Sequence, residues 1–490
     1  MRFRLKRPVF CLLLCLWSGI ATSAEASDPF GTEAALPLKP ALRLGGAVGD
    51  PCVDAMPQGA LNLLDVVNLA LCNNPQTREV WASSRVQAAQ LGVNQGSYLP
   101  GLSMNVSGNR NSPGNQQRSI GLTLSYLLYD FGSRAANLEN ARQLLAAASA
   151  SQDSTVQAVF LAAVQAYYQT QATQAALDAA HEAERAAKQS FAAAEARYLA
   201  GSATPADKLQ AQTAYSQATL NRITADGSLK KTGGALANII GLDANRSVTL
   251  AAANTEIVPA SFDQNVNALI EEAKQRRPDL IAAEAQVKAA EAGADAARAA
   301  GKPSISLNAS TTQVNSAGAS SRGSSLGVSI SVPLFAGYAP TYRVRAAEAQ
   351  VEAQQARTER VRLQVALDVW NAYQNLITAT QSLRTTADLL SSATQSERVA
   401  LGRYQAGVGN MLDVLNAQSV LAGARQQRIQ STLDWNIGRA ALAQAMGNLD
   451  GTLLQTLSPA LSLEESGGQG LAPRDSISGQ SPAAPEKALP

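Results

Sequence analysis

Few residues of this 490-residue chain have the types and spacing that catalysis requires. Its one histidine, His181, stands in an alanine-rich helical stretch, where we expect a surface side chain rather than a metal ligand or general base. Carboxylates recur beside basic residues at helical spacing, as Glu348 and Glu352 do before Arg357, and a solvated helix face explains them. Neither a glycine-rich phosphate loop nor a paired nucleophile and base is recognisable. We expect no enzyme activity, no cofactor and no metal.

One acidic residue could act through its charge alone. Asp413 follows a glycine-marked turn at Gly407 and precedes a new helical stretch. An aspartate in this position is explained by helix capping or by the helix dipole. If several copies of the chain converge there, the same carboxylates would form a ring that attracts cations and repels anions. The sequence leaves both explanations open.

Residues 1–24 have the pattern of a secretory signal. A basic start is followed by the short apolar run Val9–Trp17 and by small residues that offer a cleavage site near Ala24. The apolar run is too short to cross a bilayer as a helix. We expect an exported mature chain, beginning with an N-terminal arm over residues 25–60.

Two cysteines remain once the signal is removed. Cys52 and Cys72 would lie in an oxidising compartment, where a pair of cysteines favours a disulfide, here closing a loop of about 20 residues. Two buried free thiols are the alternative. Lysine and arginine number 40 and aspartate and glutamate 38, so nothing indicates a nucleic-acid partner.

The chain repeats itself with an offset of about 205 residues. Repeat 1 covers residues 61–245, repeat 2 covers 263–450, and a linker spans 246–262. The matching segments include Arg197–Gly201 with Arg403–Gly407, and the Asn74-Pro75 step with Arg277-Pro278. Residues 464–490, rich in Gly, Ser and Pro, are expected to form a disordered tail.

Each repeat predicts a helix, two strands, a long helix and a further helix. The first helices are expected over about 61–97 and 264–300. The long helices have neither Gly nor Pro from Arg134 to Ala200 or from Thr341 to Leu401, and the first of them would extend about 100 Å. Alanine is abundant at their packing positions, which favours a coiled coil or a thin-walled helical tube.

The strands are expected at about 102–110, 119–127, 304–312 and 324–334. In Ser325–Val332 apolar residues alternate strictly with Ser or Gly, so a strand would have one apolar face and one small, polar face. This pattern is typical of a strand between lipid and a wet lumen. Aromatic residues cluster where the second strands would leave the membrane, and an aromatic girdle or, alternatively, packing at a strand–helix junction explains them: Tyr126, Tyr129, Phe131, Phe335, Tyr338 and Tyr342.

Four membrane strands cannot close a barrel, and open edges in lipid would leave backbone groups unsatisfied. Several copies must therefore share one barrel, and the small polar face favours three copies with twelve strands and a lumen over two with eight. The predicted fold class is mainly α with a small β part.

These features resemble the TolC family of outer-membrane factors. The resemblance rests on the paired units, on the strand exits Tyr129–Gly132 and Pro333–Gly337, and on Arg403–Gly407 followed by Asp413–Ala417. It implies a homotrimer in the outer membrane, whose twelve-stranded barrel stands on a long periplasmic α-helical tunnel. It also implies partners: an inner-membrane adaptor, an ABC-type pump, outer-membrane lipid and an exported polypeptide.

The resemblance also implies a gate at the periplasmic end. By motif, Asp413 matches a ring aspartate, Tyr404 a linking tyrosine and Asp207 its partner aspartate. The chain departs from the family at Asn416, which replaces a second ring aspartate, and at Gly409, which replaces a linking arginine.

Residues 63–78 resemble the type I secretion branch, whose ducts export toxins of the haemolysin and adenylate cyclase kind. A channel for drug or small-molecule efflux is the alternative. A trimeric helical surface stalk shares the alanine-rich helices but does not require the strand pairs.

Overall fold

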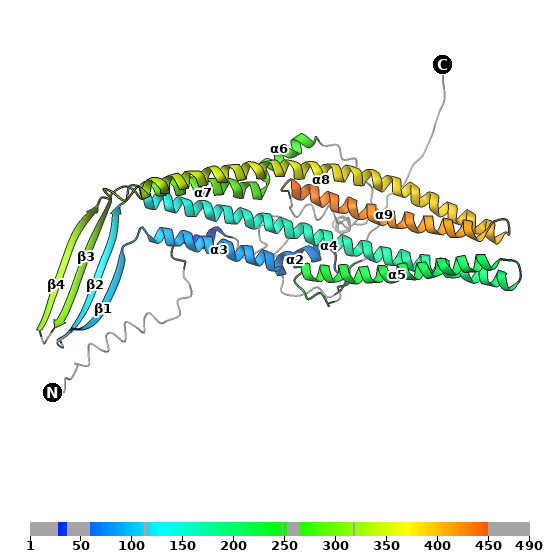
Figure 1. Ribbon diagram of the computed structural model, residues 1–490, viewed down its shortest axis with the longest axis horizontal. Helices are drawn as coiled ribbons and strands as arrows, with labels where there is room; N and C mark the ends of the chain where they lie inside the picture. The colour runs from blue at the N-terminus through cyan, green and yellow to red at the C-terminus, as the bar shows by residue number, and fades with distance from the viewer. Residues whose placement is uncertain are drawn as a thin grey trace, which may run out of the picture.

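The computed structural model describes residues 28–36, 59–111, 115–246, 248–251, 265–316 and 319–448. The predicted signal peptide, Cys52, the predicted disordered tail and most of the predicted linker lie outside these ranges. The molecule is long and narrow, with a four-stranded sheet at one end and two helix–helix turns at the other (Figure 1).

The helices occur in two copies of the same length. The first copy comprises α2 (Leu63–Asn73), α3 (Pro75–Gly96), α4 (Ser133–Leu199) and α5 (Pro205–Ile239). The second comprises α6 (Val266–Arg276), α7 (Pro278–Ala299), α8 (Ala339–Gln405) and α9 (Met411–Ala445). Both α4 and α8 have 67 residues, and both α5 and α9 have 35, so one offset of 206 residues (339 − 133 and 411 − 205) relates these helices. A short 3₁₀ helix, η1 (Thr32–Ala35), contacts α3.

The expected first helix of each repeat is in fact two helices, because a proline interrupts it. Asn74 and Arg277 have ψ values of 128° and 120°, which are extended rather than helical. A residue before proline is driven out of the helical region by the proline ring, while proline itself suits the first position of a new helix. The prediction of one continuous helix over 61–97 and over 264–300 was therefore wrong at these two steps.

The four strands form one antiparallel sheet in the order β1-β2-β3-β4. They are β1 (Gly101–Asn111), β2 (Asn115–Tyr129), β3 (Ser304–Ser316) and β4 (Ala319–Ser331). Pairing continues beyond the apolar alternation, to Asn111↔Asn115 and Ser316↔Ala319, so all four strands are longer than predicted. The fourth starts earlier and ends earlier than predicted, at Ser331, two residues before Pro333, which has no N–H for a ladder.

The register gives the sheet two different faces. One row across all four strands consists of Leu102, Leu124, Ala309 and Leu326. The neighbouring row on the opposite face consists of Ser103, Thr123, Ser310 and Ser325, and the hydroxyls of Ser310 and Ser325 are 2.8 Å apart. Leu326 is 76% exposed in the single chain, so the apolar face lies uncovered. The predicted division into an apolar and a small polar face is present.

Two equivalent cores hold the helical shaft together midway along its length. In the first, Leu71 of α2 and Phe160 of α4 are fully buried with Leu236 of α5. In the second, Leu280 of α7 is buried with Val365 and Leu383 of α8. Among the described residues no helix is both long and apolar enough to cross a membrane.

Candidate gate at the helical hairpin tips

Both hairpin tips are closed by the same backbone turn. Gly201 and Gly407 adopt φ values of +73° and +77°, and each ends its long helix. In each turn the N–H of the next residue donates to the carbonyl of an arginine four positions before the glycine: Ser202 to Arg197 at 2.9 Å and Val408 to Arg403 at 3.0 Å. This arrangement satisfies the last helix carbonyls and suits glycine, which tolerates positive φ. The two tips lie together at the end remote from the sheet (Figure 1).

Tyr404 links the two hairpins within the chain. Arg197, in the last turn of α4, stacks its guanidinium 4.1 Å from the centroid of the Tyr404 ring. The same guanidinium donates to the Tyr404 carbonyl oxygen at 2.9 Å. Tyr404 is only 7% exposed. A cation over an aromatic face combined with a charge-assisted hydrogen bond makes a specific contact between the repeats.

A small apolar cluster and a polar pair support this link. Ala194 of α4 and Ala211 of α5 are buried against Tyr404, Met411 and Val414. Slightly farther along the helices, the amide nitrogen of Gln418 donates to the hydroxyl of Ser190 at 3.1 Å. Repeat 1 and repeat 2 therefore meet through α4 and α9 in addition to the arginine–tyrosine contact.

Asp207 has a local role in the structure. Its carboxylate accepts hydrogen bonds from the N–H of Thr204 at 3.0 Å and from the Thr204 hydroxyl at 2.8 Å, which completes a capping box at the start of α5. Among the described residues, no hydrogen bond joins Asp207 to Tyr404. The tyrosine–aspartate link implied by the resemblance is thus not formed within one chain, where Arg197 contacts Tyr404 instead.

Asp413 and Asn416 lie one turn apart on α9, and both are exposed. The Asp413 N–H donates a hydrogen bond to the side-chain oxygen of Asn410 at 2.7 Å, and this bond caps the start of α9. The Asp413 carboxylate itself has no hydrogen bond or ion pair within the described ranges. The charge of this carboxylate is therefore unpaired in the described part of the chain, as the ring hypothesis requires. The carboxylate also lies in the first turn of α9, at the positive end of the helix dipole.

Gly409 stands where the backbone folds tightly against the preceding helix end. A Cβ at this position would lie 3.1 Å from both the Arg403 Cβ and the Tyr404 nitrogen. A side chain would fit at this position only if the neighbouring backbone shifted slightly. The missing linking arginine is thus accompanied by a turn with little room for one.

The sequence also drew attention to the histidine and to the two cysteines of the mature chain. His181 is exposed on α4, and no group of three or more potential metal-ligating His, Cys, Asp or Glu residues occurs in the described part of the chain. Cys72 is disulfide-bonded. Because Cys52 lies outside the described residues, the Cys52–Cys72 pairing stays a prediction.

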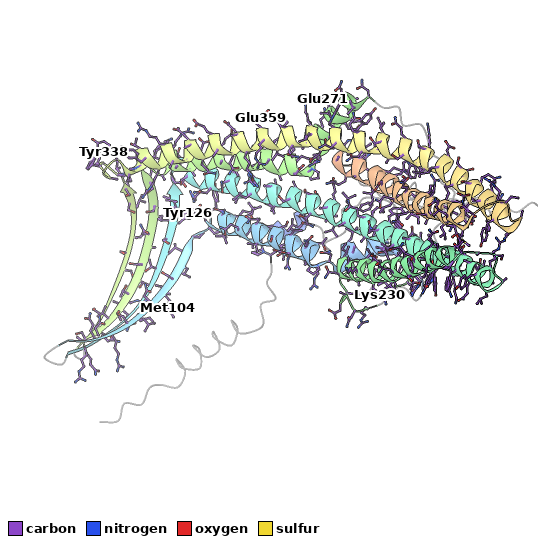
Figure 2. The ribbon with its side chains drawn as sticks, turned by 45° about the vertical axis from the view of Figure 1, so that its right-hand side comes forward. Met104, Tyr126, Lys230, Glu271, Tyr338 and Glu359 are labelled. Atoms are coloured by element: carbon purple, nitrogen blue, oxygen red, sulfur yellow. The ribbon has the colours of Figure 1, made fainter. Side chains whose placement is uncertain are left out.

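The aromatic residues gather where the sheet joins the long helices. Tyr129 contacts Phe131 with ring centroids 4.7 Å apart, and Phe335 contacts Tyr338 at 5.6 Å. Figure 2 marks Tyr338 at the junction of the sheet with α8. Phe335 and Tyr338 are largely exposed, so packing within one chain does not explain both.

The sequence-based predictions did not include Arg197, Ser190 or Gln418 among the site residues. The repeated Arg-Tyr step at 197–198 and 403–404 was visible as a match between the repeats. That match could have indicated that these residues make contacts, although not which of the two arginines meets which tyrosine.

Comparison with known proteins identifies the class. The model of the family described as outer membrane efflux protein matches residues 66–242 and 269–448, so the chain belongs to that family. Solved structures with the same fold include a membrane protein from Pseudomonas aeruginosa, at 25% identity and a TM-score of 0.70, which covers 79% of this chain and 93% of that one. They also include CusC, at 23% identity and a TM-score of 0.71, covering 84% of this chain and 98% of that one.

Two relatives of known name are similar to this chain over most of its length. Protein CyaE of Bordetella pertussis is 30% identical over 464 residues, which cover 91% of this chain and 97% of that protein. Outer membrane protein TolC of Escherichia coli is 24% identical over 430 residues, covering 82% and 85% respectively. The chain is an outer-membrane efflux or secretion channel of the TolC family, and both its family and its fold are those of channels rather than enzymes.

Proposed function

We propose that three copies of this chain form the outer-membrane exit duct of a type I secretion system. The cargo is a protein toxin of the haemolysin or adenylate cyclase (cyclolysin) kind. The duct crosses the periplasm and the outer membrane, while an ABC-type pump and an adaptor in the inner membrane supply energy and docking. The observation that carries this proposal is the resemblance of residues 63–78 to the type I branch, together with the near-full-length similarity to Protein CyaE.

The open sheet supports the trimer. Strands β1 and β4 each pair on one side only within the chain. In lipid, unpaired edge groups cost several kcal/mol each, about the loss expected for an unsatisfied polar group in hydrocarbon. Pairing β4 of one copy with β1 of the next would remove both edges, and three copies would give a twelve-stranded barrel with a lumen. Its apolar face would contact lipid and its serine-rich face the lumen.

Efflux of small molecules is the second candidate. Toluene efflux pump outer membrane protein TtgC of Pseudomonas putida is 25% identical over 406 residues. A serine-lined lumen does not by itself distinguish a polypeptide from a drug. The distinction depends on the adaptor and pump that the duct engages.

Deleting the gene separates the two candidates. Type I secretion predicts that the toxin accumulates inside the cell while susceptibility to drugs stays unchanged. Increased susceptibility to drugs with normal toxin export would instead establish efflux. Purified protein added to a planar bilayer should give single-channel conductance, and a surface stalk would give none.

A further inference from the structure

Inside one chain, repeat 1 and repeat 2 are joined at the tips by two polar contacts. Arg197 stacks on and hydrogen-bonds to Tyr404, and Ser190 pairs with Gln418. Each contact joins α4 of repeat 1 to a helix of repeat 2. Ser190 and Tyr404 are buried.

The offset of 206 residues gives every one of these four residues a twin of the same type. Arg197 corresponds to Arg403 and Ser190 to Ser396 on α8. Tyr404 corresponds to Tyr198 on α4, and Gln418 corresponds to Gln212 on α5. The chain thus carries the residues of these two polar contacts a second time.

In the described part of the chain, the contacts of this second set are not formed. Arg403, Ser396 and Gln212 are exposed, and Tyr198 is 38% exposed. Within the described ranges, the side chains of Arg403, Ser396 and Gln212 have no hydrogen bond, ion pair or ring contact. Arg403 and Ser396 lie on α8, whereas Tyr198 lies on α4 and Gln212 on α5. In the internal contact the two repeats have the opposite roles: the arginine and serine lie on α4, and the tyrosine and glutamine on α8 and α9.

A head-to-tail association would bring the two halves of this set together. The contact between repeats 1 and 2 is heterologous, because each repeat uses a different surface, so it leaves one surface of each kind open. The sheet has the same organisation: β2 of repeat 1 pairs with β3 of repeat 2, while β4 and β1 remain as edges. A second copy of the chain fits both open surfaces at once.

We infer that, in the duct proposed above, Arg403 of one copy stacks on Tyr198 of the next copy, and Ser396 hydrogen-bonds to Gln212 of that same copy. The inference rests on the proposed assembly of several copies around one channel. It makes the ring of hairpin tips a closed series of alternating internal and intermolecular arginine–tyrosine contacts.

Two differences make the intermolecular contact weaker than the internal one. Lys208 lies 5.5 Å from the centroid of the Tyr198 ring and forms an ion pair with Glu195 at 2.9 Å, whereas the twin of Lys208 is the buried Val414. A second cation near the ring weakens the attraction for Arg403. The internal Arg425–Glu182 ion pair is also not repeated, because Thr219 stands in the place of the arginine. The contact between copies is therefore the weaker of the two.

Paired cysteines test this inference directly. In the double variant Ser396→Cys with Gln212→Cys, a short, reducible, thiol-specific crosslinker should join neighbouring copies into covalent dimers and trimers. The matched variant Ser190→Cys with Gln418→Cys should react equally well but only within one chain, without change in the mass of the denatured chain. Each single-cysteine variant should give no trimer, which controls for the native cysteines.

The assembly state in detergent is measured before crosslinking. Covalent trimers from the 396/212 variant, with the 190/418 variant linked only internally, support the inference. If the protein is oligomeric and the 190/418 pair reacts while the 396/212 pair does not, the inference is wrong and the proposed duct survives. If no oligomer forms, both are wrong.

Discussion

At the residue scale, the tips are held by side chains that each make more than one contact. Arg197 binds both the ring and the carbonyl of Tyr404, so the loss of either contact alone leaves the other in place. A cation–π contact contributes about 0.5–2 kcal/mol depending on its desolvation. That is enough to fix the position of a helix end while still allowing it to be displaced.

Asp413 should control ion preference through its unpaired charge. Three exposed carboxylates at one constriction would favour cations, so Asp413→Asn should reduce the cation preference of single channels without altering their assembly. The converse variant Asn416→Asp should increase it, because it adds a second carboxylate one helical turn away. Reversal potentials under a salt gradient measure both effects. Unchanged selectivity in Asp413→Asn would leave the interaction with the helix dipole as the explanation of this residue.

Tyr168 should make stability depend on alkaline pH. Burial, together with the neighbouring Tyr167, raises the pKa of Tyr168 to about 12 from an ordinary value near 10. The folded protein therefore keeps the phenol proton that the unfolded chain loses near pH 10. The resulting stability is fully present below pH 10 and is lost as the pH rises towards 12. The loss amounts to at most about 3 kcal/mol, because each pKa unit corresponds to about 1.4 kcal/mol.

The measurement is the free energy of unfolding of wild type and Tyr168→Phe between pH 9 and 12, an interval set by the shift from about 10 to about 12. The difference between the two proteins should change with pH in this interval. Tyr198→Phe, at an exposed position, is the control. A constant difference would show that Tyr168 contributes nothing to the alkaline transition.

At the element scale, the proline breaks are the points where short helices fasten to the ends of long ones. Asn74 donates to the Ile239 carbonyl at 3.1 Å, and its equivalent Arg277 donates to the Ala445 carbonyl at 3.4 Å. Ile239 and Ala445 are the last residues of α5 and α9. The backbone at Gly241 packs closely against the end of α2, because a Cβ on Gly241 would lie only 2.7 Å from the Asn73 carbonyl oxygen. The two repeats thus use the same joint with different side chains.

Replacing Arg277 should be more damaging than replacing Asn74. Arg277 is 7% exposed and forms ion pairs with Asp279 at 2.6 Å and Asp368 at 3.1 Å. Arg277→Ala leaves two partly buried carboxylates without their cation and should cost about 3 kcal/mol. Asn74→Ala removes two neutral hydrogen bonds, one to the Ile239 carbonyl and one from the Gln76 N–H that caps α3, and should cost about 1–2 kcal/mol. Chemical denaturation compares the two variants, and equal losses would contradict the role given to the ion pairs.

At the scale of the whole molecule, the sheet and the hairpin tips are separated by the length of the helices between them. Helix α8 has 67 residues and therefore spans about 100 Å. The tips cannot be influenced by the sheet through direct contact. Movement must pass along the hairpins or come from a partner that binds near the tips, and we expect the tips to untwist when the adaptor engages.

Locking the two hairpins together should therefore stop export. The Ser190→Cys and Gln418→Cys variant, treated with a reducible thiol crosslinker, should lose export of the cargo and regain it after reduction. Single-cysteine variants treated in the same way should export normally. Continued export through the crosslinked channel would show that the hairpins do not separate within a chain during opening.

Much of the architecture follows from sequence because it depends on local patterns. The alternation in Ser325–Val332 determined the two faces of the sheet, since side chains of a strand alternate by geometry. The absence of Gly and Pro from Arg134 to Ala200 determined a long helix, and Gly201 and Gly407 determined where the hairpins turn. The proline effect at Asn74 and Arg277 is equally local, yet one helix was predicted across each step.

Only the tertiary structure decided which equivalent residues meet. Arg197-Tyr198 and Arg403-Tyr404 are the same Arg-Tyr step, and each is followed by an alanine and a glycine at the same spacing. Within the chain Arg197 lies on Tyr404, whereas Arg403 remains exposed. Because the sequence is repeated, each of the two contact surfaces occurs in both repeats. The sequence therefore cannot indicate which arginine meets which tyrosine within the chain. That choice depends on how α4 packs against α9, a contact between segments more than 200 residues apart.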